Sequence, residues 1–158
     1  MAQNITPFIW FDNQAEEAMN FYVSIFKDSK VLDVSRYGEA GPGEPGSVMV
    51  ANFQIEGQEF SAINGGPHFK LTPAISFMVS CETQEEVDKL WDALLEGGEA
   101  MQCGWVTDRF GVTWQIIPRI LSQLLQDPDP EKSGRVMKAM MEMVKLDISG
   151  LQKAYDGQ

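Results

Sequence analysis

The chain has 158 residues, enough for one domain with a sizeable core or for two small fused modules. Its formal net charge of −11 argues against nucleic acid or an anionic membrane as a partner, because both repel an acidic protein. Neither a long apolar run nor a signal-peptide pattern is visible, and two cysteines make no disulfide framework, so we expect a reducing, cytoplasmic location.

The first predicted module spans about residues 5–64. Its opening stretch, residues 5–11, is apolar throughout and predicts a buried strand. Asn13 followed by Glu16 is typical of a helix start, and apolar residues then recur at helical spacing. Three more strands are predicted at residues 30–37, 47–55 and 58–64.

The same pattern repeats in residues 73–118. Thr83 and Glu86 form a capping box at the start of a second helix, and Gly97 and Gly98 end that helix. The acidic pair and the apolar pairs of the two helices match in order, which indicates an internal duplication. The strands of this module are predicted at residues 73–81, 99–106 and 112–117.

Residues 119–158 follow both modules and predict helices. A short helix covers residues 120–125, a longer one covers residues 131–145, and Asp147 can cap a third. The longer helix carries an apolar stripe that has to be covered by its own chain or by a partner, and we expect a homodimer that uses it. The stripe consists of Val136, Met137, Met140, Met141 and Val144.

Residues 105–118 carry the most distinctive pattern. Asp108 and Gly111 predict a tight turn that leads into a strand ended by Pro118. This hairpin resembles the last hairpin of the vicinal oxygen chelate superfamily, which includes glyoxalases, extradiol dioxygenases and bleomycin-resistance proteins. Further stretches resemble its PhnB-like branch, often labelled demethylubiquinone methyltransferase. These stretches are residues 6–12, 15–22, 64–67, 127–131 and 145–147.

The resemblance implies an α+β fold in which tandem βαβββ modules form a cupped mixed sheet, with residues 1–118 as this domain and residues 119–158 as a C-terminal helical extension. It also implies metal ligands on the first and last strands of each module. In this sequence those places fall near Pro7, Asn64, Ala74 and Gln115. None of them is an imidazole, thiolate or carboxylate donor, so we expect neither a bound metal nor another cofactor.

Our main hypothesis is therefore a small-molecule-binding member of the superfamily without the usual metal ligands. Its partly apolar ligand would accept or donate hydrogen bonds at Asn64, Ser76 and Gln115, with Phe53 and Trp105 as apolar walls. Asn64 and Gln115 would share one cleft. Two alternatives stay open: a metal-dependent lyase, isomerase or dioxygenase of the same superfamily, or the labelled methyltransferase.

Other candidate sites are weaker. His68 is the only histidine and could act as a general base, but no Ser or Cys lies near it in sequence. Residues 41–46 match GxGxxG literally, yet the prolines and the following strand indicate a hairpin loop rather than a cofactor loop. Trp10 and Trp114 are predicted to point towards the helices.

Overall fold

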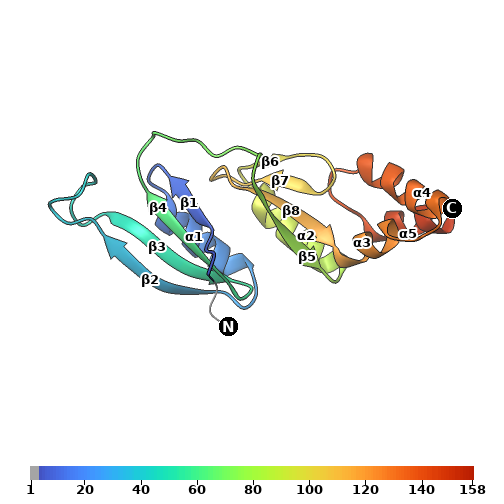
Figure 1. Ribbon diagram of the computed structural model, residues 1–158, viewed down its shortest axis with the longest axis horizontal. Coiled ribbons are helices and arrows are strands. Elements are labelled where there is room, and N and C mark those ends of the chain that lie inside the picture. The colour runs from blue at the N-terminus through green and yellow to red at the C-terminus, as the bar shows by residue number, and fades with distance from the viewer. Residues whose placement is uncertain (1–3) are drawn as a thin grey trace. The chain divides into compact units, whose positions relative to one another are not determined.

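The computed structural model describes residues 4–158, so the first three residues of the predicted 1–118 domain lie outside it. The chain divides into two compact units between Leu71 and Thr72. Each unit holds one βαβββ module, and the second also holds the C-terminal helices (Figure 1). The α+β class, the tandem modules and the helical extension are confirmed. Within residues 4–158 no helix is both long and apolar enough to cross a membrane.

The first module follows the predicted order closely. It consists of β1 (Phe8–Phe11), α1 (Ala15–Ile25), β2 (Lys30–Arg36), β3 (Val48–Ile55) and β4 (Gln58–Asn64). The strands form a mixed sheet in the order β1-β4-β3-β2, in which only the β1–β4 pair is parallel. Glu56 and Gly57 both have positive φ, as the tight turn between two antiparallel strands requires.

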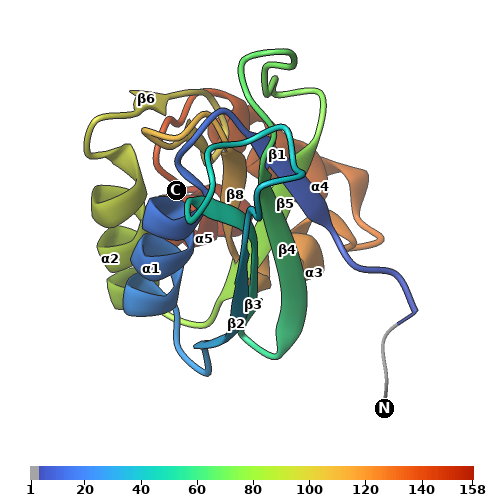
Figure 2. The same ribbon diagram turned by 90° about the vertical axis from the view of Figure 1, so that its left-hand side faces the viewer.

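Helix α1 covers one face of this sheet (Figure 2). Alternate residues of β3 are buried because successive side chains of a strand point to opposite faces. The buried set includes Phe53, whose ring stacks on Phe60 and lies near the ring of Tyr22 from α1. The other face of the sheet is the open face of the first unit.

The start of α1 differs from the prediction. The helix begins at Ala15 with Gln14 as N-cap residue, and no side chain of this segment caps it, so Asn13 is not the cap. The free N–H of Ala15 instead donates to Asn64 Oδ1 at 2.8 Å. A residue from the end of β4 therefore satisfies one of the donors that a helix start leaves open.

The second module contains β5 (Ser76–Cys81), α2 (Gln84–Leu95), β6 (Glu99–Ala100), β7 (Trp105–Thr107) and β8 (Thr113–Pro118). Its sheet has the order β5-β8-β7-β6, with β5 parallel to β8. The single strand predicted for residues 99–106 is two strands, because Cys103 and Gly104 take positive φ and turn the chain. Thr83 caps α2 as predicted, accepting a hydrogen bond from the Glu86 N–H.

The C-terminal extension forms α3 (Arg119–Leu125), α4 (Pro130–Met141) and α5 (Ile148–Asp156), gathered beyond β8 (Figure 1). These helices have a core of their own, made by Leu121, Leu124, Val136, Leu146 and Leu151. The Tyr155 hydroxyl donates to Asp127 at 2.5 Å, and this hydrogen bond lowers the pKa of the Asp127 carboxyl and raises the pKa of Tyr155.

Candidate functional site

Three of the predicted site residues meet on the open face of the second sheet. Gln115 on β8 donates from Nε2 to the Ser76 hydroxyl on β5 at 2.9 Å. Trp105 on β7 is the direct partner of Gln115 on the other side, and Met78 on β5 is its partner on the first side. Met78 is 63% exposed. The face therefore presents a hydrogen-bonded polar pair between an indole ring and a thioether.

The Asp108–Gly111 turn sets the direction of β8. Asp108 is 3% exposed, and its Oδ1 accepts the N–H groups of Phe110 and Val112. Its Oδ2 accepts the indole N–H of Trp114 at 2.9 Å. Trp114 is thereby held in the core on one face of β8, so its neighbour Gln115 points to the opposite, open face. The predicted orientation of Trp114 is correct.

Strand register can be compared between the parallel strand pairs of the two modules. Phe11 ends β1 and Cys81 ends β5, each shortly before a helix. Three residues earlier lie Phe8 and Met78, whose partners across the parallel pairs are Ser61 and Gln115. Ser61 and Gln115 are therefore each the cross-strand partner of the residue that lies three positions before the end of the first strand of its module.

Ser61 belongs to a polar row on the open face of the first sheet. Its hydroxyl donates to Asn52 Oδ1, and Asn52 Nδ2 donates to Asp33 at 2.8 Å. Period-2 alternation along residues 48–55 would have found Asn52, since the residues on either side of it are apolar.

Phe53 and Asn64 have structural roles in the first unit. The Phe53 side chain is fully buried under α1 and presents no surface to a ligand. Asn64 uses its side chain twice, accepting from the Ala15 N–H and donating to the Val48 carbonyl at 3.2 Å. Trp10 shares the open face with its partner Ile63, so its predicted orientation towards the helix is wrong. That Asn64 and Gln115 share one cleft stays a prediction.

The donor set at the four strand places does not fit the metal that the superfamily resemblance implies. The places inferred from sequence hold Pro7, Asn64, Ala74 and Gln115, and the paired strand residues near them include Phe8, Ser61 and Met78. A ring, a hydroxyl, a thioether and an amide offer no anionic or imidazole ligand to a divalent ion. Among residues 4–158, no group of three His, Cys, Asp or Glu side chains is placed to hold a metal.

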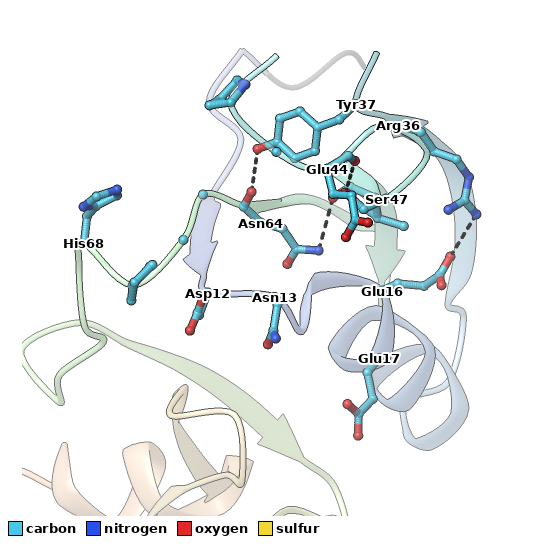
Figure 3. Close-up of a pocket in the computed structure, with 16 residues that line it drawn as sticks. Asp12, Asn13, Glu16, Glu17, Arg36, Tyr37, Glu44, Ser47, Asn64 and His68 are labelled. Carbon is cyan, nitrogen blue, oxygen red and sulfur yellow. Dashed lines mark hydrogen bonds and ion pairs between the residues drawn. The ribbon is translucent and has the colours of Figure 1, made fainter. Parts of the chain in front are cut away.

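A separate pocket of about 710 Å³ lies in the first unit (Figure 3). Its walls include both His68 and residues 42–44 of the loop at residues 41–46. The Tyr37 hydroxyl donates to the Asn64 carbonyl at 2.6 Å, and Arg36 pairs with Glu16 at 3.6 Å. A strand follows the loop, as predicted, and a Cβ at Gly43 would collide with the Tyr37 ring.

Comparison with known proteins places the sequence and fold in context. A family model described as 3-demethylubiquinone-9 3-methyltransferase matches residues 3–117. A Bacillus cereus PhnB protein with a provisional 3-demethylubiquinone-9 3-methyltransferase designation is 41% identical, with a TM-score of 0.69. The match covers 73% of this chain and 99% of that one. A comparison with curated proteins found no match.

More distant structures share the fold alone. Protein PA1353 from Pseudomonas aeruginosa is 21% identical, with a TM-score of 0.62 over 74% of this chain and 98% of its own. The fosfomycin resistance protein FosX from Listeria monocytogenes, solved with Mn(II) and sulfate, is 12% identical. Its TM-score is 0.50 over 72% of this chain and 89% of its own.

Proposed function

Because the chain belongs to the PhnB-like family described as 3-demethylubiquinone-9 3-methyltransferase, within the glyoxalase/bleomycin resistance/dioxygenase superfamily, we propose that it binds a small, partly apolar molecule. The ligand lies on the open face of the second sheet. The observation that carries this proposal is the Gln115–Ser76 hydrogen bond beside the Trp105 ring. A few polar groups set among apolar ones are what small-molecule sites usually contain.

The chemistry of this face defines the ligand class. Gln115 donates one N–H to Ser76, and its Oε1 accepts no hydrogen bond from the residues that the structure describes. A ligand N–H or O–H can therefore bind that oxygen, while an aromatic or aliphatic part lies against Trp105 and the exposed Met78. Phe53 is not part of this proposal because it is buried in the first unit.

A ligand screen by fluorine NMR on protein labelled with fluorotryptophan tests the proposal. A binding molecule is expected to shift the Trp105 signal and to leave the signal of the buried Trp114 in place. Gln115→Ala should weaken its affinity about fivefold to tenfold, the effect of one lost hydrogen bond. The matched control is Gln123→Ala on the exposed surface of α3. A ligand whose affinity is equal in wild type and Gln115→Ala contradicts the assignment.

The metal-dependent alternative predicts a different result. FosX was solved with Mn(II), but a 12% identical structure shows only the fold, and the four strand places here lack suitable donors. We expect no stoichiometric Zn, Ni, Fe or Mn in protein purified without chelator or affinity tag, measured by elemental analysis. One equivalent of metal that disappears in Gln115→Ala would favour the lyase, isomerase or dioxygenase alternative.

The methyltransferase alternative requires a binding site for a methyl donor. Methyl transfer needs a methyl donor, and the GxGxxG match at residues 41–46 joins two antiparallel strands instead of opening a helix. The loop therefore lacks the helix N-terminus that such motifs use. Saturable binding of S-adenosylmethionine, measured by calorimetry, would favour this alternative.

A cytoplasmic location remains part of the proposal. Both cysteines are free thiols.

A homodimer is also part of the proposal. The apolar stripe of α4 is divided in the structure: Val136 is buried among the C-terminal helices, whereas Met137 is 42% and Met141 62% exposed. Apolar side chains at this exposure favour a further surface to cover them. Light scattering should give a dimer for the wild type and a monomer for Met137→Glu/Met141→Glu. Gln123→Glu on α3 controls for added charge, and a monomeric wild type contradicts the expectation.

A further inference from the structure

The C-terminal extension contacts the turn that leads into Trp105. We infer that this extension, which begins just beyond the family match at residues 3–117, is a positioning element for the ligand face. Its residues 143–146 hold the turn at residues 101–104 and, through this turn, the Trp105 ring beside Gln115. The inference rests on the proposed function of that face, and it concerns where the ring lies rather than what binds to it.

Two backbone hydrogen bonds join the extension to the turn. The Cys103 N–H donates to the Met143 carbonyl at 2.9 Å, and the Gly104 N–H donates to the Val144 carbonyl at 2.7 Å. The Gly104 carbonyl in turn accepts from the Ile116 N–H on β8 at 2.8 Å. Gly104 is thus fixed between the extension and the strand that carries Gln115.

The turn itself is unfavourable for its sequence. Cys103 has φ of 59° and Gly104 has φ of 83°, and the Trp105 N–H closes the turn on the Gln102 carbonyl at 3.2 Å. Two successive residues with positive φ are typical of a type I′ turn, which prefers Asn-Gly. This conformation is sterically unfavourable for a cysteine, because its Cβ crowds the backbone when φ is positive. The two bonds to the extension therefore help to favour this turn over others, together with the bonds of Trp105 to Gln102 and of Ile116 to Gly104.

Packing restricts the turn further. Gly104 is buried, and a Cβ there would press on the Ile116 carbonyl and on the Leu146 side chain. Leu146 is fully buried in the core of α3, α4 and α5. The core of the extension therefore packs directly against the turn. A displacement of Leu146 is expected to displace Gly104 as well.

Helix α2 anchors the same segment from the other side. Gln84 Nε2 donates to the Leu146 carbonyl at 3.1 Å, and Gln84 Oε1 accepts from the Ile148 N–H at 2.7 Å. Lys145 Nζ forms an ion pair with Asp88 at 2.9 Å. Gln84 acts on Trp105 only indirectly, through residues 143–146 and the turn at residues 101–104. Weakening the hydrogen bonds of Gln84 therefore tests whether this segment controls the position of the Trp105 ring.

The experiment compares full-length variants labelled with fluorotryptophan, with Trp105→Phe assigning the signal. Gln84→Ala should broaden or shift the Trp105 signal and speed amide exchange at Cys103 and Gly104 about tenfold, as expected when two hydrogen bonds are weakened. The signal of Trp10 in the first unit should stay unchanged. Gln123→Ala, an exposed glutamine on α3, serves as the control.

Rescue separates positioning from general destabilisation. Adding Cys103→Asn to Gln84→Ala makes the turn favourable by itself, because Asn tolerates positive φ. The Trp105 signal should return to its wild-type position while exchange at Leu146 and Ile148 stays fast. Should Gln84→Ala fold poorly, Lys145→Ala removes the ion pair with Asp88 instead and should give a smaller change of the same kind.

The inference would be overturned if Gln84→Ala made amide exchange fast at Leu146 and Ile148 but left exchange at Cys103 unchanged. The Trp105 signal would also be unchanged in that case. Failure of Cys103→Asn to restore the signal would overturn it as well. Neither readout requires a ligand. A negative result in the ligand screen on wild-type protein therefore counts against the proposed function alone, whereas these results count against the positioning role alone.

Discussion

Replacing Asp108 by alanine is expected to lower the free energy of unfolding by roughly 3–5 kcal/mol, because three N–H donors lose one charged acceptor. The donors are the backbone groups of Phe110 and Val112 and the indole of Trp114. All three bonds are buried, so water does not replace the lost carboxylate in the folded state.

Graded variants locate the effect. Asp108→Asn keeps one oxygen for the turn and replaces the other by an amide N–H₂, so it should lose mainly the Trp114 bond and about half the stability change. Chemical denaturation followed by the Trp114 fluorine signal measures both variants. Asp92→Ala on the exposed side of α2 is the matched control and should change little. A loss below about 1 kcal/mol for Asp108→Ala would show that the turn holds without this carboxylate.

The second large effect is expected at Phe53. Phe53→Ala should cost roughly 3–5 kcal/mol, as truncation of a fully buried aromatic side chain usually does. Its ring is stacked on Phe60 and lies near Tyr22, so the lost volume leaves a cavity under α1. Phe53→Leu should cost less because it keeps most of the apolar contact.

The control for Phe53 is another aromatic residue of the same sheet. Phe8 is 59% exposed, so Phe8→Ala should change the free energy of unfolding by less than about 1 kcal/mol. Denaturation followed by the Trp10 signal reports on this unit. A Phe53→Ala variant of nearly wild-type stability that loses ligand affinity would restore the reading of Phe53 as a wall of the ligand site.

The sequence predicted much of the site on the second sheet. Alternation along residues 112–117 put Trp114 and Gln115 on opposite faces, and the structure joins Gln115 to Ser76 as one polar pair. Strand alternation is a local property with a period of two, so it survives without knowledge of the partner strand. The role of Asn64 was harder to predict from sequence, because its side chain caps a helix that begins 49 positions earlier.

Apart from the division of residues 99–106 into β6 and β7, the sequence by itself determined the order of strands and helices, the duplication and the α+β class, because turn residues, capping residues and apolar periodicity act within a few positions of the chain. Only the tertiary structure decided the burial of Phe53 and the pairing register that sets Phe8 beside Ser61 and Met78 beside Gln115. It also decided the contact between residues 143–146 and the turn before Trp105. Register and such long-range contacts depend on which segments meet in space, and a slip of one residue exchanges the two faces of a strand.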